Sequence, residues 1–150
     1  MKNELKITFS LSKSETKNLS GFEYGSVYIE GKLGNFSTDE LNKTLMISLT
    51  IMSLLDGIVE FTKNKSVNTF RWETVEAIFI TNFLRKSKGM VEVSRNNMKI
   101  ALISEKVLIN SIYLSISEFL DFFLENLPPD SAAFYDISLS LKEFNTLNRR

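Results

Sequence analysis

Three carboxylates near the end of the chain have the spacing that most directly suggests a chemistry. Glu118, Asp121 and Glu125 stand at i, i+3 and i+7, which places them on one face of a helix with no Lys or Arg between them. An acidic strip of this kind suits docking to a basic partner surface. The spacing also fits a solvated helix face, in which Glu118 caps the backbone and the helix dipole favours the early acids. A carboxylate-pair hydrolase would need the acids in a cleft, and their spacing places them in none.

A second candidate patch surrounds Trp72, the only tryptophan in the chain, and adds the acids Glu73 and Glu76. Tryptophan is enriched among the residues that dominate binding energy at protein interfaces. A tryptophan at the end of a strand also fits the edge of a hydrophobic core, and the sequence leaves both readings open. We take Trp72, Glu73 and Glu76, together with the strip of Glu118, Asp121 and Glu125, as the predicted partner-binding residues.

The composition excludes several classes of chemistry. The chain contains no cysteine and no histidine, which excludes thiol nucleophiles, disulfides, Cys/His metal sites and the Ser-His-Asp triad. Its 18 basic and 18 acidic residues balance, which weakens the case for direct binding to nucleic acid. Gly31 and Gly34 form neither a P-loop nor a dinucleotide-binding motif. We therefore expect a protein that is not an enzyme and uses no cofactor or metal.

At 150 residues the chain is expected to form a single domain, residues 1–150. The first residues lack the apolar segment of a signal peptide, and the longest apolar run, residues 45–61, is interrupted by polar residues. We expect a cytoplasmic protein that does not bind membranes.

The elements that must position these residues are read from hydrophobic periodicity. We expect an α+β fold, a largely antiparallel sheet of about six to eight strands with two main helices packed on it. Thr50 is expected to cap a helix over residues 51–62, and Ser115 and Glu118 to form a capping box for a helix ended by Pro128 and Pro129. Asn96 and Asn97 suit a hairpin turn. The expected strands cover residues 5–11, 22–33, 43–49, 67–72, 75–84, 90–95, 98–104 and 107–114.

Three segments, residues 47–60, 112–127 and 137–144, share a pattern of alternating Ile and Leu followed by a capped helical start. Their irregular spacing does not match a repeat protein. A strand over residues 137–141 and a short helix from Leu141, capped by Ser140 and Glu143, remain open alternatives. The apolar residues Leu55, Phe79, Leu120 and Phe123 are expected in the core.

The order of elements over residues 5–127 resembles the small bacterial immunity proteins of polymorphic and contact-dependent inhibition toxin systems, in particular the WapI-type immunity family. The resemblance lies in two N-terminal strands, a strand and apolar helix over residues 45–61, a Trp-bearing strand, a meander, and the closing run Phe119-Leu120-Asp121-Phe122-Phe123-Leu124. It implies a cytoplasmic inhibitor that binds and occludes one cognate toxin domain. The alternative is a small-ligand or lipid-binding α+β domain whose Phe and Tyr residues line an apolar pocket.

Overall fold

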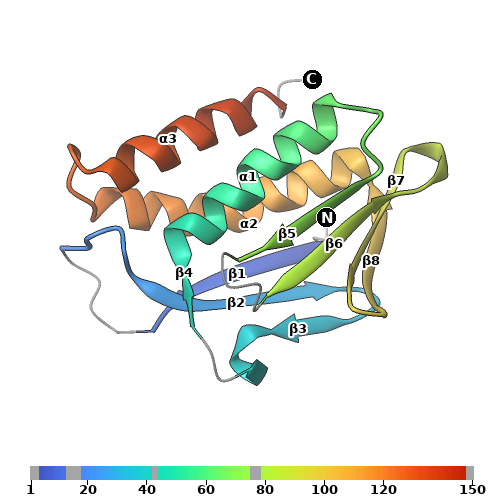
Figure 1. Ribbon diagram of the computed structural model, residues 1–150, viewed down its shortest axis with the longest axis horizontal. Helices are drawn as coiled ribbons and strands as arrows, with labels where there is room; N and C mark the ends of the chain where they lie inside the picture. Colours follow the sequence, from blue (N-terminus) through green and yellow to red (C-terminus); the bar gives the residue numbers. More distant parts are fainter. Residues whose placement is uncertain (1–3, 13–17, 42–43, 75–78, 148–150) are drawn as a thin grey trace.

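The computed structural model describes residues 4–12, 18–41, 44–74 and 79–147. Within these ranges the chain forms eight strands and three helices, an α+β fold with two four-stranded antiparallel sheets (Figure 1). In the first sheet β2 pairs with β1 on one side and with β3 and β4 on the other. The second sheet is a meander in the order β5-β6-β7-β8. The strands are β1 (Leu5–Leu11), β2 (Tyr24–Gly31), β3 (Asn35–Ser37), β4 (Leu45–Met46), β5 (Thr69–Glu73), β6 (Ile80–Arg85), β7 (Met90–Arg95) and β8 (Met98–Ser104).

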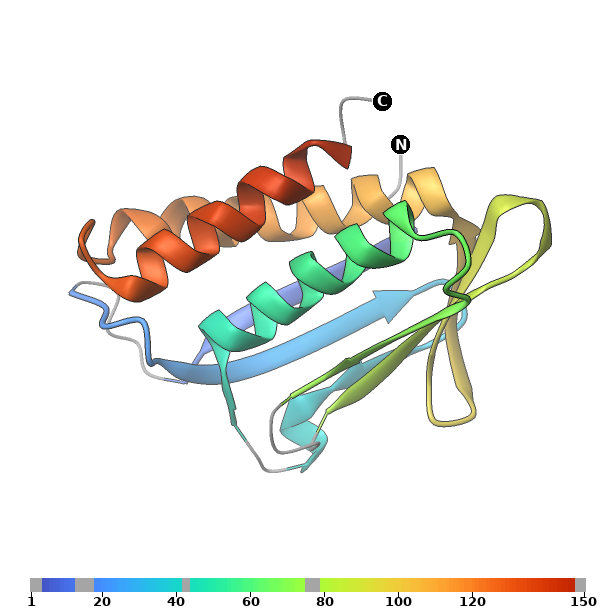
Figure 2. The ribbon, with the colours of Figure 1, turned by 45° about the horizontal axis from the view of Figure 1, so that its top comes forward.

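The helices α1 (Ile47–Lys63), α2 (Glu105–Glu125) and α3 (Ala132–Asn145) all lie on the same side of the two sheets (Figures 1 and 2). In contacts between elements, α1 packs against β5 and α3, whereas α2 packs against β1. Helix α2 is therefore fixed to the first sheet, although it directly follows the last strand of the second sheet.

The turn after β2 joins the two sheets. The backbone N–H of Leu33 donates a hydrogen bond to the carbonyl oxygen of Ile100 in β8, at 3.0 Å. A side chain at position 31 would place its Cβ only 2.2 Å from the same oxygen, so this close approach requires Gly31. The two sheets thus share one core beneath the helices.

Aromatic rings fill much of that core. Trp72 is fully buried, with its ring centroid 4.8 Å from that of Phe79 and 6.4 Å from that of Phe9. Its indole N–H donates to the backbone oxygen of Thr50 at 3.0 Å, so the one polar atom of the side chain is satisfied inside α1. The expected core residues Leu55, Phe79, Leu120 and Phe123 are all buried, which confirms that prediction.

Arg85, at the end of β6, connects α1, α2 and the second sheet. Its guanidinium donates to the backbone oxygens of Phe61 and Val67, pairs with the Glu105 carboxylate at 3.0 Å, and lies 4.3 Å above the Phe61 ring. Lys65 also reaches Glu105, at 2.9 Å. Burial alone would raise the pKa of Glu105, but its contacts with Lys65 and Arg85 outweigh burial and lower that pKa. This cluster of Phe61, Lys65, Val67, Arg85 and Glu105 is called the Arg85 node below.

The strand predictions for residues 5–11, 90–95 and 98–104 are confirmed to the residue. The Asn96-Asn97 hairpin is also confirmed, with Asn96 in the left-handed region at φ 53°. β3 was not expected, and residues 75–78 of the expected strand 75–84 lie outside the described residues.

The expected strand over residues 107–114 is wrong, because α2 begins at Glu105 and includes them all. Its N-cap is Ser104, whose hydroxyl accepts a hydrogen bond from the Val107 N–H at 3.1 Å. Ser115, the expected N-cap, lies inside the helix and instead accepts a hydrogen bond from the Ile7 N–H of β1 at 3.0 Å. A Ser-x-x-Glu sequence is therefore present without a helix start, because the serine is used for a tertiary contact.

The other two expected helix starts are also misplaced. Residue 43 of the expected strand 43–49 lies outside the described residues, and of residues 44–49 only Leu45 and Met46 form a strand. Helix α1 begins at Ile47, so Thr50 lies inside the helix and donates to the Met46 oxygen at 2.8 Å. Residues 137–144 belong to α3, whose N-cap is Ser131. The strand alternative for residues 137–141 is therefore wrong, and the helix begins well before the expected capping box at Ser140. The three similar segments are mainly helix interiors, which share a spacing of apolar residues rather than a strand-to-helix junction.

Candidate functional site

The acidic strip, defined as Glu118, Asp121 and Glu125, lies exposed along one side of α2. The opposite side carries the buried residues of the helix, Leu108, Ile109, Ser111, Ile112, Ile116, Leu120 and Phe123. Because that side is fixed in the core, the strip can only face outward. Leu114 continues the strip one turn earlier and is 46% exposed. Among the described residues, the strip acids form no ion pair with a Lys or Arg.

A groove runs between β1 and α2, directly beside the acidic strip. It encloses about 490 Å³ and is lined by Lys6, Ile7, Thr8, Phe9, Leu114, Ser115, Glu118, Phe119 and Phe122. The hydrogen bond from the Ile7 N–H to the Ser115 hydroxyl joins the strand and the helix at this groove. This β1–α2 groove is the place where an apolar surface and a strip carboxylate meet.

A second hollow lies at the other end of the strip. It encloses about 460 Å³ and is lined by Asn18, Leu19, Glu125, Asn126, Leu127 and Pro128. The Leu19 N–H donates to the Asn126 oxygen at 3.0 Å, which holds the loop before β2 against the end of α2. The strip is thus bordered by a hollow near each end.

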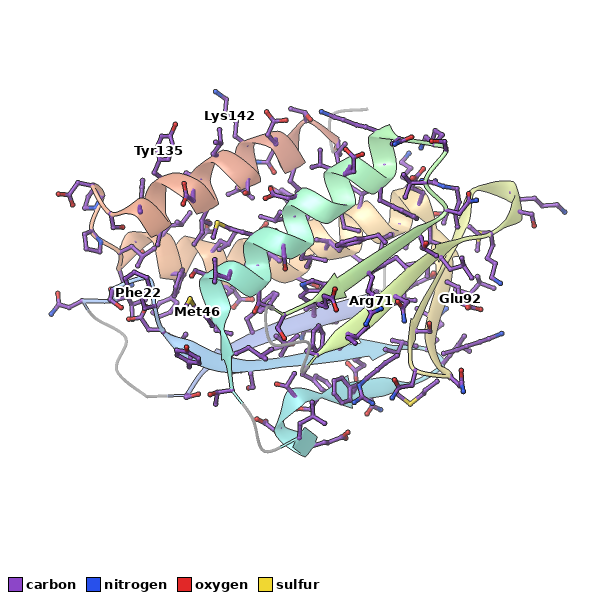
Figure 3. The ribbon with its side chains drawn as sticks, viewed as in Figure 1. Phe22, Met46, Arg71, Glu92, Tyr135 and Lys142 are labelled. Atoms are coloured by element: carbon purple, nitrogen blue, oxygen red, sulfur yellow. The ribbon has the colours of Figure 1, made fainter. Side chains whose placement is uncertain are left out.

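The Trp72 patch is not a surface site in this structure. Trp72 is fully buried, so the prediction that it forms part of a binding patch is wrong. Aromatic packing and the hydrogen bond to Thr50 both draw the indole inward. Glu73 is exposed, and its carboxylate lies 3.3 Å from Arg71 (labelled in Figure 3), which offsets its charge. Glu76 lies outside the described residues.

Sequence reasoning missed the exposed aromatic residues Phe22, Tyr24 and Tyr135. Phe22 is 69% exposed and lies near the start of α1 (Figure 3). Its loop is held by Glu23, whose carboxylate accepts hydrogen bonds from the N–H groups of Ser20 and Gly21 and from the Ser20 hydroxyl. Burial alone would raise the pKa of Glu23, but these hydrogen bonds outweigh it and lower the pKa. The expected strand 22–33 hid this residue, because an apolar residue at the start of a strand reads as core.

The described residues contain no group of three His, Cys, Asp or Glu placed to hold a metal ion. Helix α2 is long and apolar enough to cross a membrane by length and composition, a property that core helices of globular proteins share. In this structure its apolar side packs against β1 and the core. Helix α2 therefore carries core residues on one side and the exposed acids of the strip on the other.

Of the six predicted site residues, the structure brings together Glu118, Asp121 and Glu125, and separates them from the buried Trp72. No protein-family model, curated protein or solved structure matches the chain.

Proposed function

We propose that this protein is an immunity protein, which binds a cognate bacterial toxin domain in the cytoplasm and neutralises it by occlusion. One observation carries the proposal: an exposed acidic strip, without a described counter-ion, borders a groove that combines apolar and polar side chains. An inhibitor of this kind covers the working surface of the toxin and needs no cofactor, membrane or direct contact with nucleic acid.

The strip suits a basic toxin surface, such as one that attacks nucleic acid. Exposed carboxylates act mainly on the rate of encounter, because fully solvated charges contribute little to the final affinity. Since the whole chain has no net charge, the steering field comes from this local strip. Affinity then has to come from apolar contacts beside it, which Leu114 and the groove provide.

The alternative function, a small-ligand or lipid-binding domain, would need an enclosed apolar pocket. The space between helices and sheets is occupied by fully buried side chains, including Trp72, Phe79 and Phe83. The two hollows beside α2 are open to the surface and carry charged or polar residues. These features favour a protein partner over an enclosed ligand.

The test is association with the toxin domain encoded beside this gene, measured by stopped flow at low and high salt. The triple variant E118K/D121K/E125K is expected to associate about tenfold or more slowly at low salt, because steering by charge accounts for rate factors of about 10–1,000. Its association rate should also depend less on salt than that of the native protein.

The matched control is D56K/E60K/D136K, which makes the same change in net charge at three exposed acids on α1 and α3. It should associate faster than the strip variant. Equal rates for the two variants would remove the strip as the docking surface. If the native protein fails to bind the toxin domain, the immunity function is refuted.

A further inference from the structure

The β1–α2 groove has apolar walls that are already held in place. The Phe119 ring packs 5.8 Å from Phe9 of β1 and stacks 5.3 Å from Phe123, which is fully buried. The Ile7 N–H bonds the Ser115 hydroxyl, which fixes the distance between strand and helix. Because the core already holds these walls in place, the groove side chains lose little conformational entropy when an occupant binds.

The groove is elongated. On the helix its lining runs from Leu114 to Phe122, which corresponds to about 12 Å at a rise of about 1.5 Å per residue. An extended chain advances about 3.3 Å per residue, so this length accommodates about four residues of a strand-like segment. Ser115 offers a polar contact within the groove, because a hydroxyl that accepts one hydrogen bond can still donate its own proton to a carbonyl.

The charges at the groove favour a basic occupant. Glu118 lines the helix side, and Asp121 follows it on the same exposed face. Lys6 lines the strand side, and its register partner in β2 is Glu30, although the described ion pairs include none between these two residues. Because the two acids Glu118 and Asp121 outnumber Lys6, the net charge around the groove is negative.

From this geometry we infer that the β1–α2 groove receives an extended segment of the toxin domain, in which an apolar side chain packs between Leu114, Phe119 and Phe122. A Lys or Arg next to that side chain faces Glu118. This inference rests on the proposed immunity function and adds to it the chemistry of the segment that is bound. In this complex the groove residues slow dissociation, whereas Asp121 and Glu125 outside the groove speed association.

Two variants alter the groove without touching the core. Thr8→Trp places a large side chain at an exposed β1 position that lines the groove, and Leu114→Ala removes an apolar wall while keeping good helix propensity. Their matched controls are Ser10→Trp, on the same exposed face of β1 but outside the groove lining, and Leu139→Ala, a leucine of α3 that is 49% exposed. Circular dichroism and thermal unfolding verify that all four variants fold.

We expect both groove variants to weaken binding of the toxin domain at least tenfold through faster dissociation, with association and its salt dependence little changed. The two controls should bind as the native protein does. Native affinity in both groove variants would overturn the groove inference while leaving the immunity function in place.

A second measurement tests whether the groove binds a basic segment, without using the toxin domain. The peptide acetyl-Lys-Phe-Lys-amide is titrated into the ¹⁵N-labelled native protein up to its solubility limit, with acetyl-Glu-Phe-Glu-amide as the control. The basic peptide should shift the amide resonances of Thr8, Ser115 and Glu118, and the acidic peptide should leave them in place. If the basic peptide shifts none of these resonances, the inference is overturned, even where the toxin itself is not bound.

Discussion

Replacing Arg85 with Met should destabilise the protein far more than the same change at Arg71, although both arginines lie in the second sheet. The Arg85 side chain is 15% exposed and serves two backbone carbonyls, the Glu105 carboxylate and the Phe61 ring. Met preserves the apolar stem but leaves these groups without their donor. Breaking a buried charged pair by removing one partner costs about 3–5 kcal/mol. Lys65 still pairs with Glu105 in the variant, so we expect a loss near the lower end, about 3 kcal/mol.

The control Arg71→Met removes an arginine that is 58% exposed and pairs only with Glu73 among the contacts described for it. Such surface pairs contribute about 0–1 kcal/mol. A further variant, Arg85→Lys, keeps the charge but loses the planar fork that reaches several acceptors at once, so it should fall between the two.

Urea unfolding followed by tryptophan fluorescence measures all three variants, because Trp72 is the only tryptophan and is fully buried. A loss of about 3 kcal/mol corresponds to a decrease in Tm of about 6–12 °C for a domain of this size. If Arg85→Met costs no more than Arg71→Met, the Arg85 node does not hold the three elements together and the reasoning fails.

Three more results are expected. Ser104→Ala should lower the free energy of unfolding by about 1 kcal/mol through loss of an N-cap. Ser115→Ala should lower it by about 1–3 kcal/mol, because the buried Ile7 N–H loses its acceptor. Faster hydrogen exchange of the Ile7 amide in Ser115→Ala, and not in Ser104→Ala, distinguishes the two causes. Phe123→Ala should cost about 3–5 kcal/mol in urea unfolding, and a loss below about 1 kcal/mol would contradict its enclosure. The folded-state pKa of Glu105 lies below its ordinary value of 4.5, so its contribution to folding stability is complete above that pH and is lost as the pH falls below it. Glu105→Gln should therefore reduce the loss of stability between neutral and acid pH. An unchanged dependence of stability on pH would refute the role given to Glu105.

The β7–β8 hairpin is predicted correctly because its signals are local. The β7–β8 hairpin combines alternating apolar residues with Asn96, whose side chain tolerates positive φ, so a short stretch of sequence is sufficient to define it.

The start of α2 is predicted wrongly for an identifiable reason. Residues 107–114 are rich in Ile, Leu and Val on every side, which fits a strand as well as a buried helix. The helical spacing of Leu108, Ile112 and Ile116 was present, and Ser104 followed by Glu105 offered a cap with an acid in the first turn. The expectation of separate strands over residues 98–104 and 107–114, with Glu105 and Lys106 between them, concealed both signals.

Part of the candidate site, the acidic strip, could be predicted from the sequence, whereas the groove and the burial of Trp72 could not. Helical spacing alone places Glu118, Asp121 and Glu125 on one side of α2, where the structure also has them. The groove could not be predicted, because it depends on β1 lying against α2, which no local pattern specifies. The burial of Trp72 likewise depends on Phe9 and Phe79, which come from distant parts of the chain.

The hydrogen bond between Ile7 and Ser115 has a consequence for synthesis of the protein, because it joins residues 108 positions apart. During translation the outer edge of β1 has no helix to cover it until most of the chain has left the ribosome. Contacts of such long sequence separation also form late, since a long loop must close first. A nascent or truncated chain that ends before α2 would therefore have an unprotected strand edge and no groove, since the groove forms only when the helix around Ser115 packs against β1.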